Sequence, residues 1–420
     1  MRQRTLGRLL LTLVVITSLV PDIGIKFATF GFHWTAYRLT MFIALILSLC
    51  MHSGKVAIIR KSHTGRMTVL MGVWIVYGLL LLVSSPYSVQ HSGLIELLSI
   101  LNGFFLFMII NALGIKEGYV HLIDKIVIWV VNILLFVALF EIVTGKHLAA
   151  SSFNNSASSA YGYANIHMAT GFSYNINDFS AMLSCLFPVV FIADNTKKKW
   201  ITLAGIVVVN LINDATTCNL AIIVSVGFLY IINSNVGSRW RLIRRMLVWI
   251  ALLLICIFLV YGQSYLFNRS GILGALSRQI FYARRGSGSL YARLTIYKDA
   301  IIAWINSGML GMGPSSFSNY FSQKVSLSGL VNPHSLALEI LFQYGIIIFA
   351  WYAILLFKMF SGAYRIYKRK DVQENKKKYS MVMMIIIVYA IASFAPSTFL
   401  GYAYQWLLVA MCCMRLDLAK

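Results

Sequence analysis

The sequence predicts an all-α protein whose helices cross a lipid bilayer about twelve times. Hydrophobic residues make up 59% of the 420 residues and charged residues only 12%, whereas a soluble domain carries about 25% charged residues. Several apolar runs come near the ~20 residues that a helix needs to cross a bilayer. The runs are continuous and do not alternate with polar residues, which argues against a transmembrane β-barrel.

Apolar runs divide the chain into twelve expected helices within one membrane domain, 1–420. We expect the first helix to be retained, because no small-x-small cleavage site follows it. The seventh, eighth and twelfth runs are short, and the seventh and eighth could instead be re-entrant or buried in protein. The predicted spans are 7–25, 36–52, 67–85, 94–114, 125–144, 176–194, 200–213, 218–233, 246–262, 335–357, 380–397 and 402–415.

The distribution of Lys and Arg predicts that both termini face the cytoplasm. Termini and loops on one side of the predicted spans hold 26 of these residues, and the short loops on the other side hold three. Positively charged residues stay preferentially on the cytoplasmic side. Orientation therefore accounts for most of the net charge of +23, and we expect no nucleic acid as a partner.

One long loop, 263–334, lies between the ninth and tenth predicted spans and faces outward. Long loops are translocated largely regardless of their charge, so its cations do not contradict the topology. They suit either a bound phosphate or contact with anionic lipid headgroups, since Asp299 is the only acidic residue among them. The cations are Arg269, Arg278, Arg284, Arg285, Arg293, Lys298 and Lys324.

Within this loop, apolar residues recur at helical spacing and predict an amphipathic helix lying on the membrane or on the helical bundle. Arg293 falls on the flank of the stripe, at the boundary between apolar surface and water. A phosphate at headgroup depth would meet it there, although flanking arginines also snorkel routinely. The stripe consists of Leu290, Leu294, Tyr297, Ile301, Trp304 and Ile305.

A helix start signal opens the tenth span, where Asn332 and Pro333 precede His334 and Ser335. Proline is favoured in the first turn of a helix, so we expect His334 in that turn, at the water boundary. Glu339 lies a little over one turn deeper, where a carboxylate is costly. Further upstream, Asn177 or Asp178 is a candidate N-cap for the sixth span.

No nucleotide-binding or zinc-protease motif occurs in the sequence. The six cysteines all lie in apolar runs and show no metal-ligand spacing. We therefore expect no cofactor, no metal site and no disulfide framework. The outward segment 145–175 is rich in Ser, Asn and Tyr, a composition that suits sugar contacts and equally suits an ordinary polar loop.

Five stretches occur in an order and at spacings that one known family shares. They are 140–148 (FEIVTGKHL), 175–179 (NINDF), Arg293 followed by 311–317 (GMGPSSF), 332–336 (NPHSL) with Glu339 and Gly345, and 393–406. On these residues the chain resembles the O-antigen ligase and Wzy-type polymerase family of bacterial surface polysaccharide synthesis. The stretches cover most of residues 140–410, whereas 1–135 match only as hydrophobic spans.

The resemblance implies an inverting, metal-independent glycosyl transfer at the outer face of the bacterial cytoplasmic membrane. The donor would be a glycan on undecaprenyl pyrophosphate, and other polysaccharide assembly proteins are possible partners. By similarity, Arg293 would contact the pyrophosphate and His334 would serve the acceptor hydroxyl. Asn332, Glu339, Asn177 and Asp178 are candidate contacts to the glycan or acceptor.

Two positions depart from the family pattern. Ser335 follows the histidine where the family commonly has Asn, and 216–219 (TTCN) lacks an Arg that many members carry at the start of the eighth span. Arg284 or Arg285 could supply the missing pyrophosphate contact. The implied activity is a polymerase of glycan repeats, with a ligase on the same donor as the first alternative and a twelve-span transporter or flippase as the second.

The residue types suit that chemistry on physical grounds. Guanidinium groups bind phosphate oxygens in bidentate fashion, and such contacts raise the rate where they strengthen as the leaving pyrophosphate gains charge. A histidine near a helix N-terminus and near arginines stays neutral, because both disfavour imidazolium. A neutral His334 can then act as general base toward an acceptor hydroxyl.

Overall fold

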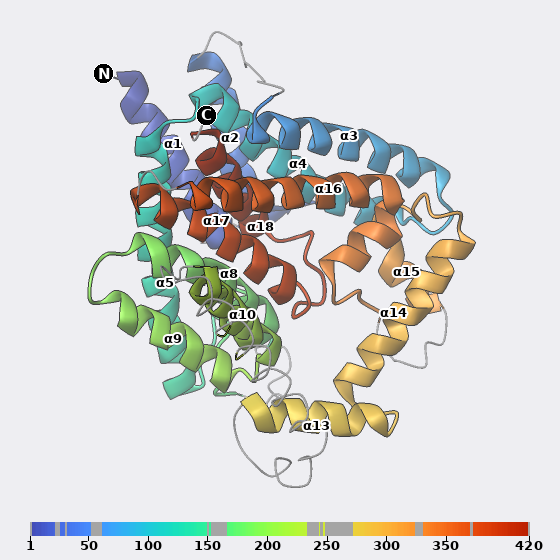
Figure 1. Cartoon of the computed structure of the whole chain (residues 1–420). Coiled ribbons are helices and arrows are strands. Elements are labelled where there is room, and N and C mark those ends of the chain that lie inside the picture. The colour runs from blue at the N-terminus through green and yellow to red at the C-terminus, as the bar shows by residue number, and fades with distance from the viewer. Residues whose placement is uncertain are drawn as a thin grey trace.

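The computed structural model describes residues 2–21, 26–29, 32–51, 61–148, 151–152, 166–232, 243, 247, 272–323, 331–369 and 373–418. Within these ranges helices dominate (Figure 1), which confirms the predicted α-helical class. A short antiparallel hairpin, β1 (Lys26–Thr29) and β2 (Phe32–Thr35), precedes the second helix. In Figure 1 the markers of both chain ends lie at the same end of the molecule.

Helices of the first half of the chain follow the predicted apolar runs. Ser62 caps α3 by accepting the Gly65 N–H, and α5 ends where Gly145 adopts a left-handed conformation, a common helix stop. The helices are α1 (Arg2–Leu19), α2 (Ala36–Met51), α3 (His63–Ser84), α4 (Gln90–Leu113), α5 (Glu117–Thr144), α8 (Ile176–Ala193), α9 (Lys199–Ile212) and α10 (Thr216–Ile232).

Among the described residues, the second half supplies three helices within the segment 263–334 and three of the bundle. Of these, α13 and α14 lie beside the bundle and away from both chain ends (Figure 1). The helices are α13 (Ile272–Arg284), α14 (Gly288–Asn306), α15 (Ser316–Gln323), α16 (Leu336–Lys368), α17 (Gln373–Ala392) and α18 (Ala403–Asp417).

Every predicted span except the ninth is matched by a helix, and the ninth, 246–262, lies outside the described residues apart from position 247. Among the described residues, five helices are long and apolar enough to cross a membrane, namely α3, α4, α5, α8 and α16. Four more, in α1, α2, α9 and α10, are apolar but shorter. The count of twelve spans stays a prediction.

The last helix, α18, forms the centre of the bundle. Its residues from Ala403 to Leu416 are all buried, and it packs against α1, α3, α4, α5, α16 and α17. A helix that is buried on every side is enclosed by protein rather than by lipid. This explains why the twelfth span is shorter than a lipid-exposed span needs to be.

A sharp break divides α16 at Gly345, which has φ 74°. The break frees backbone groups that the segment 309–313 then satisfies. Met312 and Gly313 donate their N–H groups to the carbonyls of Phe342 and Gln343, at 2.9 Å each, and the Ile346 N–H donates to the Met309 carbonyl at 3.1 Å. The Gly-Met-Gly-Pro turn is therefore the hydrogen-bonding partner of the broken helix.

We expect Gly345→Ala to destabilise the protein by more than about 1 kcal/mol, because alanine is strained at a positive φ. A Cβ at this position would lie 2.3 Å from the Leu310 carbonyl. The thermal unfolding midpoint of the detergent-purified protein measures the effect. Gly362→Ala is the matched control in the same helix, since its nearest neighbour would be 3.9 Å away; equal midpoints for the two variants would contradict the prediction.

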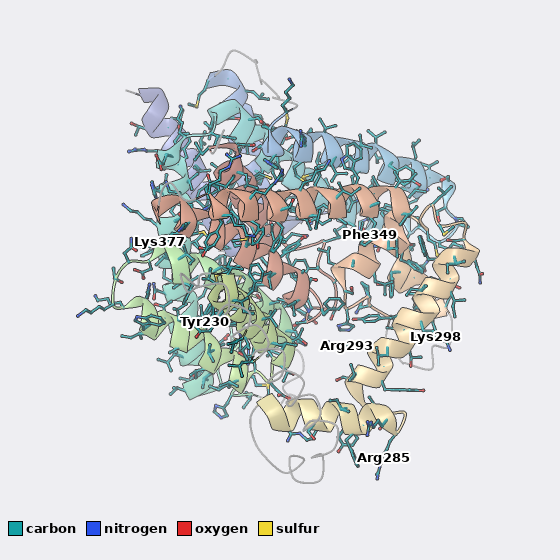
Figure 2. The ribbon with its side chains drawn as sticks, viewed as in Figure 1. Tyr230, Arg285, Arg293, Lys298, Phe349 and Lys377 are labelled. Atoms are coloured by element: carbon teal, nitrogen blue, oxygen red, sulfur yellow. The ribbon has the colours of Figure 1, made fainter. Side chains whose placement is uncertain are left out.

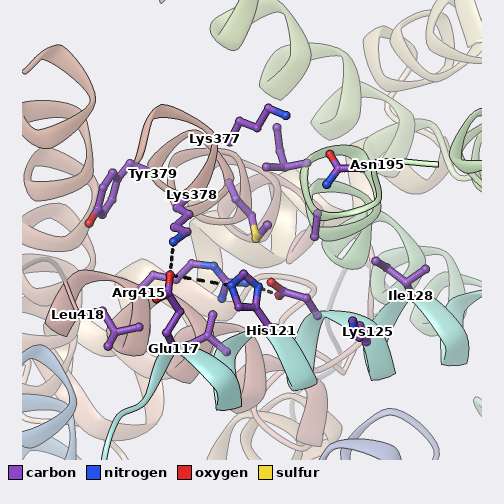
Figure 3. A pocket seen from close by; sticks show the side chains of 15 residues that line it. Glu117, His121, Lys125, Ile128, Asn195, Lys377, Lys378, Tyr379, Arg415 and Leu418 are labelled. Carbon is purple, nitrogen blue, oxygen red and sulfur yellow. Dashed lines mark hydrogen bonds and ion pairs between the residues drawn. The ribbon is translucent and has the colours of Figure 1, made fainter. Parts of the chain in front are cut away.

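A cavity of about 410 Å³ lies where α5 begins and α18 ends (Figure 3). Lys378 pairs there with Glu117, and Arg415 pairs with Asp124 in a buried ion pair. These groups belong to helix ends that the charge distribution assigns to the cytoplasmic side. The cavity does not include His334 or Arg293, so it is separate from the predicted site.

Candidate functional site

His334 lies in a strained and firmly held backbone conformation. Its φ is 46°, a left-handed value that is uncommon for residues other than glycine. The His334 N–H donates to the Ser397 carbonyl at 3.0 Å, and its carbonyl accepts from the Tyr297 hydroxyl at 2.7 Å. Strained residues held in this way cluster at functional sites, which favours a role for His334.

The expectation that His334 belongs to the first helical turn was wrong. The helix α16 begins at Leu336, and Ser335 is its N-cap, accepting the Leu338 N–H. His334 therefore precedes the helix. The physical reason is its left-handed φ, which cannot continue into a right-handed helical turn.

Burial keeps the His334 imidazole neutral. The pKa of His334 is lowered to about 4, first because the ring is desolvated and second because the Arg293 guanidinium lies nearby. Hydrogen bonding to the backbone of Ala395 and Pro396 acts in the opposite direction. Nδ1 is enclosed and has no hydrogen-bond partner among the described residues. Desolvation thus lowers the pKa of His334 more than the nearby arginine charge that the sequence led us to expect.

Arg293 lies on the side of α14 that faces the bundle (Figure 2). Its Nη1 donates to the Phe394 carbonyl at 3.0 Å. Partial burial lowers the pKa of Arg293, while Tyr297 and Cys218 act in the opposite direction. Since Arg293 influences both His334 and Cys218, it lies between the start of α10 and the histidine.

The amphipathic helix predicted around Arg293 is present as α14, but its packed face differs from the predicted stripe. Leu294, Ile301 and Ile305 are 55%, 43% and 52% exposed. The residues that pack inward are Ile296, Ala300, Ala303 and Trp304. Small alanines allow α14 to approach α16, and the exposed apolar residues are left facing outward.

Arg284 and Arg285 lie where α13 gives way to α14, and both are exposed. The Arg285 guanidinium stacks 4.3 Å from the centre of the Phe281 ring. Figure 2 shows Arg285 at the outer corner of the two helices, away from Arg293. Neither arginine is brought to the histidine in this structure.

Arg278, which we did not single out from the sequence, lies closer to the place where the family arginine is missing. It lines a cavity of about 270 Å³ with Asp214, Thr216 and Asn219 at the start of α10. Burial raises the pKa of Asp214, and the nearby Arg278 opposes that shift. Only the packing of α13 on α10 distinguishes Arg278 from its neighbours, so no sequence signal pointed to it.

Glu339 anchors the segment 393–402 that joins α17 to α18. Its Oε2 accepts the N–H groups of Phe399 at 2.8 Å and Leu400 at 3.2 Å. The same segment supplies the carbonyls that bind His334 and Arg293. Glu339 therefore helps to position the histidine and the arginine through this segment.

The remaining candidate contacts lie around these groups. Asn332 accepts a hydrogen bond from Ser318 at 3.2 Å. Asp178 is buried and bonds to Tyr402, whereas Asn177 is half-buried. The expectation that one of these two caps α8 was wrong, because Asn175 accepts the N–H groups of both, at 2.9 and 3.0 Å.

Glu141 and His147, from the first matched stretch, have a structural role. The buried Glu141 carboxylate accepts the N–H groups of Thr170 at 2.8 Å and Gly171 at 2.7 Å. The His147 Nδ1 lies 3.4 Å from the same carboxylate. These bonds fix the end of the polar segment that leads into α8.

Comparison with known proteins gives two matches. Residues 180–353 match a family model described as O-antigen ligase, a range that includes Arg278, Arg293 and His334. The chain is also 21% identical, over 430 residues, to the teichuronic acid biosynthesis protein TuaE of Bacillus subtilis strain 168. That match covers 96% of this chain and 83% of the relative.

Proposed function

We propose that this chain, which both matches support as a member of the O-antigen ligase and Wzy-type family, polymerises surface glycan repeats. It would transfer glycan from undecaprenyl pyrophosphate to an acceptor hydroxyl at the outer face of the cytoplasmic membrane, with both chain termini in the cytoplasm. The observation that carries the proposal is the meeting of a neutral, backbone-clamped His334 with Arg293. A base and a phosphate-binding cation side by side are the two groups that this reaction needs.

The reaction is a single displacement. The acceptor oxygen attacks the anomeric carbon of the donor and forms the new glycosidic bond, while the bond from that carbon to the pyrophosphate oxygen breaks. The electron pair leaves with the pyrophosphate, and the acceptor proton passes to His334. Attack opposite the leaving group inverts the anomeric configuration, and the donor bond itself supplies the driving force.

Arg293 and Arg278 are the proposed pyrophosphate contacts. Both approach the start of α10, and helix N-termini favour anions through their dipole and free N–H groups. Arginine forks match phosphate oxygens, so each charge-assisted bond stabilises the charge that develops as the leaving group departs. Arg278 thus takes the role that the sequence suggested for Arg284 or Arg285.

A ligase on the same donor is the first alternative, because the two activities share the donor chemistry and differ in the acceptor. Analysis of surface glycan on gels from a deletion strain separates them. Loss of long chains, with single repeats still attached to the surface, supports the polymerase. Accumulation of long lipid-linked polymer supports the ligase. Loss of surface glycan, with single lipid-linked repeats trapped inside the cell, supports a transporter.

The pH profile of transfer follows from the pKa of His334. Only the neutral ring accepts a proton, so kcat/KM is expected to rise as pH increases through about 4 and to stay level above it. Arg293→Gln removes a cation that disfavours imidazolium, so it moves this acid limb to higher pH. A wild-type limb near the ordinary histidine pKa, unmoved in Arg293→Gln, would contradict His334 as the base.

A further inference from the structure

A cavity of about 270 Å³ lies between α4, α15, α16 and the segment 393–402. Pro333, which directly precedes His334, forms part of its wall. Two carboxylates, Glu96 from α4 and Glu339 from α16, line it together with the amide of Gln343. Polar groups at this depth of a membrane helix are costly and usually functional, and the catalytic step described above leaves this cavity without a role.

Both carboxyl groups accept hydrogen bonds from protein donors. Glu96 accepts the Ser315 N–H at 3.0 Å and the Tyr344 hydroxyl at 2.5 Å, and Glu339 accepts two backbone N–H groups. Gln343 is 2% exposed, and its Oε1 has no hydrogen-bond partner among the described residues.

Three of the four serine hydroxyls in the wall donate their protons to protein acceptors. Ser92 donates to the Val89 carbonyl and Ser99 to the Ile95 carbonyl, each within its own helix. Ser318 donates to Asn332. A hydroxyl has one donor and two acceptor positions, so these three oxygens also offer lone pairs to the cavity.

We propose that this cavity binds the acceptor sugar, and that it selects a ring carrying hydroxyl or amino groups in preference to one carrying a carboxylate or phosphate. The assignment of an acceptor rests on the proposed function. A wall of acceptors is satisfied by a ligand rich in donors, and it repels an anion through Glu96 and Glu339. The cations Arg278 and Arg293, in contrast, lie toward α10.

The site is thereby polarised across His334. The pyrophosphate lies on the arginine side and the acceptor sugar on the carboxylate side, with the histidine segment between them. An acceptor held against Pro333 brings a hydroxyl next to the imidazole. Repulsion between the pyrophosphate and the carboxyl groups of Glu96 and Glu339 also disfavours binding of the pyrophosphate in the sugar cavity. Each substrate therefore has a separate binding position.

Binding of three monosaccharides to the full-length protein in lipid nanodiscs tests this assignment. Glucose, glucosamine and glucuronate differ in charge on the same ring, and ligand-observed NMR measures their affinities without any donor. We expect glucuronate to bind at least about tenfold more weakly than the other two, equivalent to about 1.4 kcal/mol. Glu96→Gln and Glu339→Gln should narrow that difference, and equal binding of all three to the wild type would overturn the proposal.

Since both carboxylates also hold backbone groups, a cavity-filling variant provides a second test. Ser92→Phe places a ring in the cavity and should weaken binding of glucose and glucosamine by about tenfold or more. Leu94→Phe is the matched control on the same helix, because Leu94 does not line the cavity and is 36% exposed. Indistinguishable affinities for the two variants would overturn the assignment.

The binding measurement does not depend on transfer, so the two proposals fail separately. If His334→Asn abolishes transfer but the wild type shows no preference among the sugars, the cavity assignment is wrong and the catalytic role of His334 is retained. If the preference is present but His334→Asn transfers glycan at the wild-type rate, the proposed catalytic role falls alone.

Discussion

Replacement of His334 by alanine is expected to lower the rate of glycan transfer by about 10²–10⁴-fold, the usual contribution of a positioned general base. The structure gives the reason. His334 is held by hydrogen bonds at both its N–H and its carbonyl, and its pKa of about 4 keeps the ring able to accept a proton at neutral pH. Extension of a lipid-linked glycan by the purified protein in nanodiscs measures the rate.

Because alanine is also unfavourable at the left-handed φ of this residue, a second variant separates backbone strain from base chemistry. Asparagine tolerates left-handed conformations better than most residues and has no basic ring. His334→Asn should therefore keep the wild-type unfolding midpoint while losing transfer to the same extent as His334→Ala. Transfer that survives in His334→Asn would show that the imidazole is not the base.

The second large effect is expected for the two arginines near α10. Arg293→Ala and Arg278→Ala should each lower kcat/KM by roughly 10–150-fold, which corresponds to the loss of a charge-assisted hydrogen bond worth about 1.5–3 kcal/mol. Arg293→Lys should recover only part of the rate, because lysine keeps the charge but lacks the planar fork. Steady-state kinetics with varied donor concentration give these values.

Arg285→Ala is the matched control, since Arg285 is exposed at the corner of α13 and α14 and stacks on Phe281. We expect its kcat/KM to stay within about twofold of the wild type, in line with the small effects of most surface substitutions. A loss in Arg285→Ala as large as that in Arg293→Ala would contradict the assignment of Arg278 and revive the arginine pair suggested by the sequence.

Hydropathy predicted most of the helices, because an apolar segment in a bilayer must satisfy its backbone hydrogen bonds internally and therefore forms a helix. It could not predict the break in α16 at Gly345, because that break depends on hydrogen bonds to a segment more than thirty residues away in sequence, ending at Gly313. Nor could it show that α18 is enclosed by protein, since lipid and protein interiors favour the same apolar residues.

Motif resemblance predicted His334 and Arg293, and the structure brings these two together. The same reasoning placed the start of α16 too early in the sequence. Pro333 resembles a helix-initiating proline, but the N-cap is Ser335. Sequence reasoning listed Arg278 among the loop cations but could not distinguish it from the others, since its position depends on how α13 packs against α10. Sequence reasoning did not identify Glu96 for a similar reason, since the carboxyl group that lines the same cavity, Glu339, belongs to a helix far away in the chain.

The segment 393–402 has a consequence for how this protein can diversify. It binds His334 through Ser397, Arg293 through Phe394 and Glu339 through Phe399 and Leu400. Through these backbone contacts, the segment sets the relative positions of three residues that come from different parts of the chain. A one-residue insertion in this segment would shift His334, Arg293 and Glu339 relative to one another, and so relative to both substrates. The sequences of the helices that carry these side chains would not need to change.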